Sequence, residues 1–145
     1  MTLMRITDRF YITGQIMPAD MPALAAQGFV AVINNRPDNE APDQPGHEMN
    51  AAAAAAAGLG YLYLPVTAAM MDGAVADRFR LAVDALPGPV LAHCRSGMRS
   101  FTLWAIAEVL AGKMTAQEVS ALALGRGCDA SDALNWLALN TDARP

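Results

Sequence analysis

Residues 89–100 read Pro-Val-Leu-Ala-His-Cys-Arg-Ser-Gly-Met-Arg-Ser and join two segments with different hydrophobic patterns. The first four residues form a short apolar run, whereas residues 101–107 and those that follow carry apolar side chains at helical spacing. This pattern predicts a strand, a tight turn and a helix that begins near Gly97. Unpaired N–H groups of the first helical turn would point toward Cys94, together with the positive end of the helix dipole. The turn is therefore predicted to bind anions.

Cys94 is interpreted as an activated nucleophile. Arg95 and Arg99 lie close to it in the sequence, and their charge and the helix terminus favour the thiolate over the thiol. The alternative is a small buried hydrophobic side chain, the usual role of a cysteine after an apolar strand. A core position does not account for the surrounding charged residues, because buried charge without a partner is strongly unfavourable. The predicted catalytic residues are Cys94, Arg99, Ser100 and His93, and the predicted oxyanion-binding residues are Arg95, Ser96, Gly97 and Met98.

The string from His93 to Ser100 resembles the signature loop of protein tyrosine and dual-specificity phosphatases. In that loop five residues separate the cysteine from an arginine that is followed by Ser or Thr, whereas four residues separate Cys94 from Arg99. The shorter pattern Cys-Arg-x-Gly-x-Arg resembles the loop of sulfurtransferases of the rhodanese type. The loop by itself therefore leaves both chemistries open.

The upstream sequence is similar to a bacterial family, the beta-lactamase-hydrolase-like, phosphatase-like domain family. The similarity covers roughly residues 10–124 and includes residues 11–15, 24–28, 32–38 and 61–66, in the order of the family. It implies a protein-tyrosine-phosphatase-like fold. By analogy, it also implies a sulfur-oxidising enzyme as a partner.

Strands and helices are expected to alternate along the chain, because segments with strand and helix patterns follow one another. The near-continuous apolar character of residues 29–33 is typical of a parallel sheet buried on both faces. We expect a single domain over residues 1–145 of the α/β class, with a mainly parallel four- or five-stranded sheet and helices on both faces. The expected strands are residues 10–13, 29–33, 61–66 and 89–92, and the expected helices are 18–28, 48–57, 72–86, 97–112, one from 115, and 130–139.

Composition excludes several classes of function. The net charge of −4 argues against nucleic-acid binding, which needs a basic surface. No apolar run is long enough to span a membrane, and the first ten residues lack the pattern of a secretory signal, so we expect a cytoplasmic protein. Two cysteines without paired spacing and two histidines predict neither disulfides nor a metal site, and no cofactor is expected.

Three further residues each have two interpretations. Arg36 follows a predicted strand at the edge where α/β sheets place ligands, so it could face Cys94 or be a solvated loop charge. Asp72 is the first carboxylate after the strand at 61–66, and it could serve as a catalytic acid or as a helix N-cap. Cys128 could be a resolving thiol, although an incidental loop cysteine is favoured.

Two reactions suit the predicted site, and both take a small anionic substrate. A phosphatase thiolate attacks phosphorus, and a separate acid protonates the leaving group. A sulfurtransferase thiolate becomes a persulfide, from a donor such as thiosulfate or another persulfide, and needs no strong acid. The short loop and the late Asp72 favour sulfur transfer through Cys94, with hydrolysis of a phosphate ester as the alternative. A non-catalytic anion-binding module is disfavoured, because such a pocket would not need the thiol.

Overall fold

The computed structural model describes residues 1–140, and a five-stranded sheet in the order β1-β2-β5-β3-β4 lies at its centre. Only β1 and β2 pair antiparallel, whereas β5 pairs in parallel with both β2 and β3, and β3 with β4. Cys94 therefore follows the central strand of the sheet. The strands are β1 (Met4–Arg5), β2 (Phe10–Thr13), β3 (Ala31–Asn34), β4 (Gly60–Tyr63) and β5 (Val90–His93).

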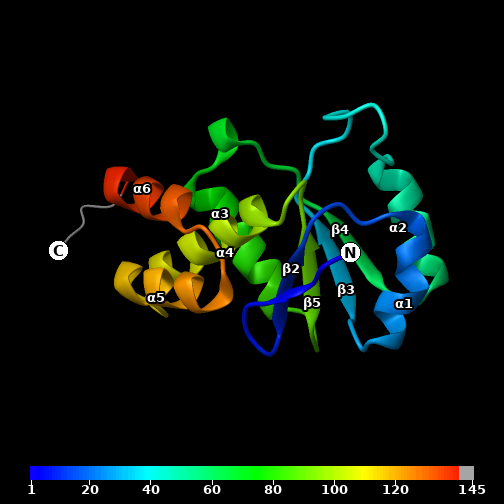
Figure 1. Cartoon of the computed structure of the whole chain (residues 1–145), viewed down its shortest axis with the longest axis horizontal. Coiled ribbons are helices and arrows are strands. Elements are labelled where there is room, and N and C mark those ends of the chain that lie inside the picture. Colours follow the sequence, from blue (N-terminus) through cyan, green and yellow to red (C-terminus); the bar gives the residue numbers. More distant parts are fainter. Residues whose placement is uncertain (141–145) are drawn as a thin grey trace.

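The parallel strands end level with one another. His93 of β5 is the register partner of Thr13 in β2 and of Asn34 in β3, and Asn34 is the partner of Tyr63 in β4. The loops that leave these four strands consequently meet at one edge of the sheet, at the top of Figure 1. Ligand sites of open α/β sheets lie at this carboxyl edge.

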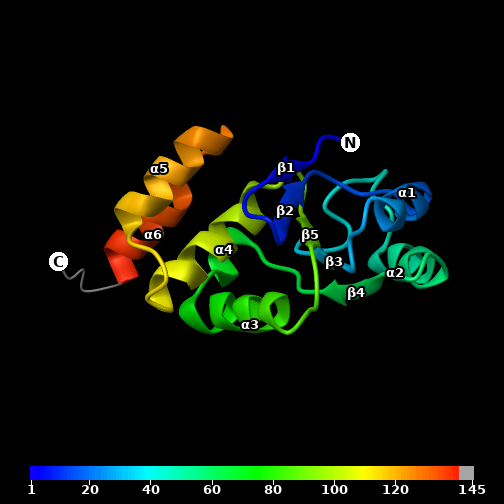
Figure 2. The same ribbon diagram turned by 90° about the horizontal axis from the view of Figure 1, so that it is seen from below.

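Helices cover both faces of the sheet (Figure 2). One face carries α1 and α2, and the other carries α3 and α4, with α5 and α6 packed beyond them. The prediction of a mainly parallel sheet between two helical layers is therefore confirmed. The helices are η1 (Pro18–Asp20), α1 (Met21–Ala26), α2 (His47–Ala56), η2 (Ala68–Met70), α3 (Gly73–Asp84), α4 (Met98–Leu110), α5 (Ala116–Arg126) and α6 (Ser131–Asn140).

Two hydrophobic cores form because successive residues of a buried strand point to opposite faces. In β5, Leu91 packs into the core under α1 and α2, whereas Val90 and Ala92 pack into the core under α3 and α4. In the second core the ring of Phe10 stacks on Trp104, with ring centroids 5.7 Å apart. These aromatic rings fasten β2 to α4, the helix that follows Cys94.

Several predicted boundaries are wrong. The expected helix at 18–28 is a 3-10 turn followed by the short α1, which has a proline in its first turn. The strand predicted at 61–66 ends at Tyr63, because the N–H bonds that follow no longer keep the regular register of a parallel ladder with β3. Leu64 and Val66 still donate N–H bonds to the carbonyls of Asn34 and Asn35. The segment 64–66 therefore stays beside the end of β3.

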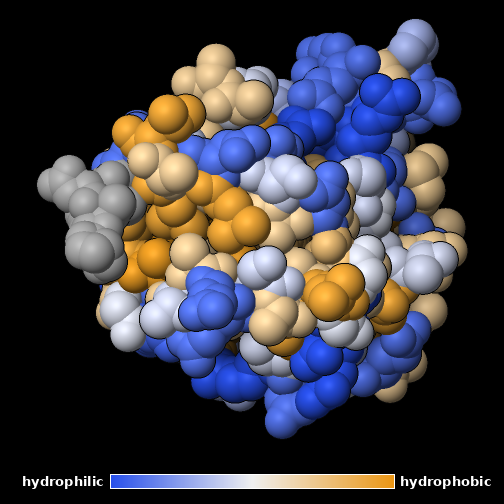
Figure 3. Space-filling model, turned by 60° about the vertical axis from the view of Figure 1, so that its left-hand side comes forward, coloured by the Kyte–Doolittle hydropathy of each residue, from blue (hydrophilic) through white to orange (hydrophobic). Residues whose placement is uncertain are grey.

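The exposed surface is uneven. On the face of the molecule seen in Figure 3, apolar side chains gather on the left, whereas much of the upper right is hydrophilic. Leu124 of α5 and Leu139 of α6 are 85% and 84% exposed. No helix in the described part of the chain is both long and apolar enough to span a bilayer.

Candidate active site

The turn after β5 folds tightly around the sulfur of Cys94. Gly97 is the N-cap of α4 with a left-handed φ of 99°, and its N–H donates to Cys94 Sγ at 3.0 Å. A Cβ on Gly97 would lie 3.2 Å from the carbonyl oxygen of Thr13, and a Cβ on Gly14 would lie 2.9 Å from that of Arg95. Glycine at both positions thus lets the turn lie against the end of β2.

The start of α4 gives the sulfur a positive environment. The N-cap residue Gly97 has no side chain that could cap the helix, and the N–H of Met98, the first residue of α4, donates to Ser96 Oγ at 3.3 Å. The first N–H groups of a helix and its dipole favour an anion, so the Gly97 contact is suited to a thiolate. Within the predicted oxyanion loop Gly97 is buried and Met98 is half-buried, whereas Arg95 and Ser96 are exposed.

Arg99 forms a two-pronged ion pair with Glu40. Its Nη1 and Nη2 each donate to a different Glu40 oxygen at 2.9 Å, and Nη1 also donates to the carbonyl of Val66 at 3.0 Å. The bonds to Glu40 raise the pKa of Arg99, against an opposing effect of burial, and the nearby Cys94 raises it further. The guanidinium fork is therefore charged and lies within electrostatic reach of the sulfur.

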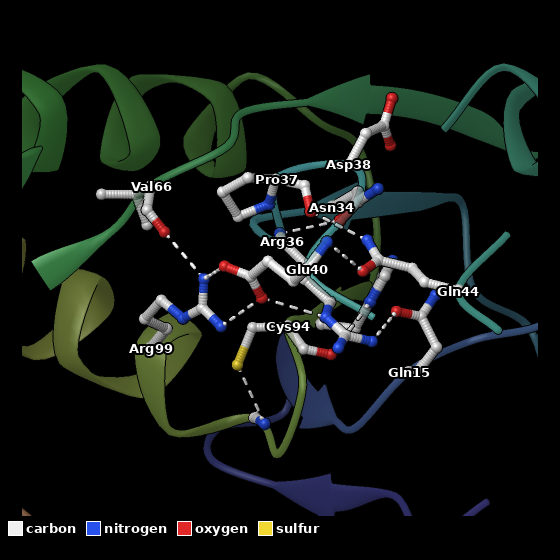
Figure 4. Close-up of polar contacts among 12 residues, drawn as sticks. Gln15, Asn34, Arg36, Pro37, Asp38, Glu40, Gln44, Val66, Cys94 and Arg99 are labelled. Carbon is white, nitrogen blue, oxygen red and sulfur yellow. Dashed lines mark hydrogen bonds and ion pairs between the residues drawn. The ribbon is translucent and has the colours of Figure 1, made fainter. Parts of the chain in front are cut away.

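Arg36 shares the same carboxylate. Its Nε donates to Glu40 Oε1 at 3.1 Å, and its Nη1 donates to the side-chain oxygen of Gln15 at 2.9 Å. The Arg36 side chain is 5% exposed, so its interpretation as a solvated loop charge is wrong. Figure 4 shows the Glu40 carboxylate between the guanidinium groups of Arg36 and Arg99, near Cys94. The two hydrogen bonds from Arg99, and then the one from Arg36, lower the pKa of Glu40 although partial burial opposes them.

His93 is an uncharged part of the strand end. Its side chain is fully buried, and burial lowers its pKa to about 4. Its Nδ1 lies 3.4 Å from the carbonyl oxygen of Cys94, and its Nε2 has no hydrogen-bond partner among residues 1–140. At neutral pH the imidazole therefore adds no positive charge to the site.

Ser100 connects α4 with two loops through Asn35. Ser100 Oγ donates to Asn35 Oδ1 at 2.8 Å, and Asn35 Nδ2 donates to the carbonyl of Leu64 at 2.9 Å. The backbone N–H of Asn35 donates to the carbonyl of His93 at 2.8 Å. Asn35 thus ties the loop after β3 to the ends of β4 and β5 and to the first turn of α4.

Asp72 and Cys128, each of which had two interpretations from the sequence, lie away from Cys94 and make structural contacts. Asp72 is exposed, and its Oδ1 accepts the N–H of Val75 at 2.8 Å as the N-cap of α3. Cys128 is half-buried, burial raises the pKa of its thiol, and its sulfur contacts Met4 of β1. Neither residue belongs to the contacts that surround Cys94.

Sequence reasoning missed three residues of the site: Gln15, Asn35 and Glu40. Glu40 lies four positions after Arg36 in a loop at the carboxyl edge, and this spacing of opposite charges was an available signal. The pairing of Glu40 with Arg99 had no such signal, because 59 positions separate the two residues.

Comparison with known proteins identifies the family. The profile described as "Beta-lactamase hydrolase-like protein, phosphatase-like domain" matches residues 2–111. The chain belongs to this family. Beta-lactamase hydrolase-like proteins of Agrobacterium fabrum and Xylella fastidiosa are each 39% identical to it, over 145 and 137 residues. These matches cover 100% and 94% of the chain but 34% and 32% of those proteins, so the chain spans about one third of their length.

Solved structures of similar proteins share the fold. The nma1982 protein of Neisseria meningitidis, a candidate phosphatase, has a TM-score of 0.83 and 30% identity, and the match covers 94% of this chain and 96% of that one. TpbA of P. aeruginosa, solved in complex with phosphotyrosine, has a TM-score of 0.71 and 19% identity over 97% of this chain and 84% of that chain. The second likeness concerns the fold alone.

The resemblance drawn from the sequence is confirmed, in family and in fold. This is a phosphatase-like domain with the architecture of protein tyrosine phosphatases. Sulfur transfer, which the short loop favoured, is not supported by these comparisons, and they favour the phosphatase alternative instead.

Proposed function

We propose that this family member hydrolyses phosphate monoesters through a cysteinyl-phosphate on Cys94. The observation that carries the proposal is one arrangement: a sulfur that accepts an N–H bond at the start of α4, with the guanidinium fork of Arg99 nearby. Phosphoryl oxygens suit both partners, because helix N-termini bind anions and a guanidinium holds two oxygens at once. Relatives described as phosphatase-like support the same reaction.

The reaction has two balanced steps. The Cys94 thiolate attacks phosphorus, so that an S–P bond forms as the bond from phosphorus to the ester oxygen breaks, and the leaving oxygen takes a proton from a general acid and departs as an alcohol. Water then attacks phosphorus and breaks the S–P bond, which releases orthophosphate and restores the thiolate. Arg99 and the first N–H groups of α4 are positioned to stabilise the charge on the phosphoryl oxygens in both steps.

The experiment compares the protein with Cys94→Ser on an aryl phosphate and on a phosphotyrosine peptide. We expect orthophosphate release from both substrates, a phosphorylated Cys94 in acid-quenched samples, and no release by Cys94→Ser. Arg99→Lys should lose most of the activity, because an ammonium group cannot form the two-pronged contact. The same sample treated with thiosulfate and weighed intact tests the other chemistry. An added sulfur on Cys94 without release of phosphate would replace this proposal with sulfur transfer.

A further inference from the structure

A phosphatase of this kind needs a proton donor for the leaving group, and the expected segment does not supply one. Residues 64–71 contain no carboxylate, and Asp72 is exposed and engaged as the N-cap of α3. The carboxylate that the fold does bring to the arginine fork is Glu40. It comes from the loop between β3 and α2, and its side chain is 27% exposed.

Glu40 binds the two arginines in the way a phosphoryl group would. Its Oε2 accepts Arg99 Nη1 and its Oε1 accepts Arg99 Nη2, both at 2.9 Å, and Oε1 also accepts Arg36 Nε at 3.1 Å. Guanidinium groups bind carboxylate and phosphate with the same planar fork. Cys94 is 1% exposed in this arrangement. A phosphoryl group that takes the Arg99 fork and reaches the sulfur must therefore displace the Glu40 carboxylate.

The backbone of Glu40 is held in place while its side chain bridges the arginines. Glu40 N–H donates to Gln44 Oε1 at 3.1 Å, and Gln44 Nε2 donates to the carbonyl of Pro37 at 2.8 Å. Asp38 adds a second brace, because its Oδ1 accepts the backbone N–H of His47 at 2.9 Å and its Oδ2 lies 2.6 Å from His47 Nδ1. A displaced Glu40 carboxylate would thus stay beside the site.

We propose that Glu40 closes the anion site against Arg99 and Arg36, and that a phosphate ester which displaces it makes Glu40 the proton donor to its leaving oxygen. This inference rests on the phosphatase function proposed above. It makes Glu40 a catalytic residue with two states, one bound to the arginines and one in contact with the substrate.

The charges around Glu40 explain how its carboxyl group can be ionised when bound to the arginines and protonated when in contact with the substrate. The hydrogen bonds to the arginines keep Glu40 ionised, and an ionised group cannot donate a proton. The substrate takes over the Arg99 fork and brings its own negative charge next to the carboxylate. Loss of a cation and gain of a neighbouring anion both raise the pKa of a carboxyl group. Binding of substrate therefore favours uptake of a proton from solvent by Glu40.

The Glu40 proton is transferred to the leaving oxygen in the first step. As the S–P bond to Cys94 forms, the ester oxygen leaves with its electron pair and takes the proton of the Glu40 carboxyl group. Glu40 is left as a carboxylate. In the second step it accepts a proton from the water that attacks phosphorus, and the S–P bond returns its electron pair to the thiolate.

The kinetic test uses Glu40→Gln with two esters, an alkyl phosphate and a fluorinated aryl phosphate whose leaving group needs no proton. Loss of the acid should lower the ratio of kcat/KM for alkyl over aryl ester about 10²-fold. Easier entry of substrate affects both esters equally and cancels in this ratio. The matched control Asp43→Asn removes an exposed charge from the same loop and should leave the ratio unchanged, as should Asp72→Asn.

A binding test is independent of turnover. In a Cys94→Ser background, Glu40→Gln should bind inorganic phosphate several-fold more tightly by calorimetry, because the competing carboxylate is gone. Unchanged phosphate affinity would overturn the closure of the site by Glu40.

In the kinetic test, an alkyl-over-aryl ratio for Glu40→Gln within about threefold of the parent value would overturn the role of Glu40 as the acid. A fall in this ratio for Asp72→Asn would assign the acid to Asp72. Absence of any Cys94-dependent hydrolysis in the parent would instead overturn the proposed function and this inference with it.

Discussion

At the scale of single residues, the charge of the site is set by opposite effects on a carboxylate and an imidazole. Hydrogen bonds to Arg99 and Arg36 keep Glu40 ionised, whereas burial keeps His93 neutral. The positive charge available to a phosphoryl group near neutral pH therefore comes from the two arginines and the start of α4. The predicted catalytic role of His93 stays a prediction.

His93 should make the fold less stable in acid. Its pKa is about 4 in the folded chain and 6.5 ordinarily, so the unfolded chain binds more protons between these values. The free energy of unfolding should consequently fall as the pH drops from 6.5 to 4, with His93 contributing about 3 kcal/mol of the loss. Urea unfolding of the parent and of His93→Gln at several pH values measures this contribution. An equally steep loss in the variant would contradict it.

At the scale of elements, local patterns in the sequence were sufficient for the strand, turn and helix around Cys94. The apolar run, the glycine and the helical spacing all lie within residues 89–110, so β5 and α4 occur close to their predicted positions. The two-residue β1 was missed because it is too short to show any alternation. Contacts of Glu40 and Asn35 with α4 were also missed, since they depend on how loops distant in sequence fold back at the sheet edge.

The bond between Asn35 and Ser100 should couple the loop after β3 to α4. Both side chains are fully buried, so Asn35→Ala and Ser100→Ala should each cost about 1–3 kcal/mol of unfolding free energy by leaving a partner unsatisfied. The double variant should cost less than the sum, because both changes remove the same 2.8 Å bond. Additive losses in urea unfolding would show that the bond contributes nothing. Whether Ser100 also assists the chemistry is read from kcat of Ser100→Ala, and that role stays a prediction.

At the scale of the whole molecule, the C-terminal helices extend the packing around the site. The family profile ends at residue 111, and α5 and α6 follow it. Val119 of α5 and Ala133 of α6 are fully buried in the same core as Phe101 of α4. These helices therefore support the helix that carries Arg99. A single domain over residues 1–145, a cytoplasmic location and a sulfur-oxidising partner stay predictions, and residues 141–145 lie outside the described chain.

Trp136 of α6 reaches from this C-terminal layer to the segment that leads away from the site. Its indole Nε1 donates to the carbonyl of Met71 at 3.1 Å, and Met71 follows the segment whose Val66 carbonyl accepts a bond from Arg99. Trp136→Phe keeps an aromatic ring but removes the donor, so we expect a loss of about 1 kcal/mol in unfolding free energy. Trp136→Ala should lose more, because the ring also packs against the core.

Urea unfolding of the two Trp136 variants beside the parent separates the hydrogen bond from the packing. Val66 lies five positions before Met71, and its side chain is fully buried. We therefore expect the hydrogen bond from Arg99 to the Val66 carbonyl to remain in both variants. Turnover of an aryl phosphate should accordingly be unchanged wherever a variant remains folded. A fall in kcat for folded Trp136→Phe would mean that α6 positions the arginine fork through Met71, and equal stability of all three proteins would mean that the bond does not anchor α6.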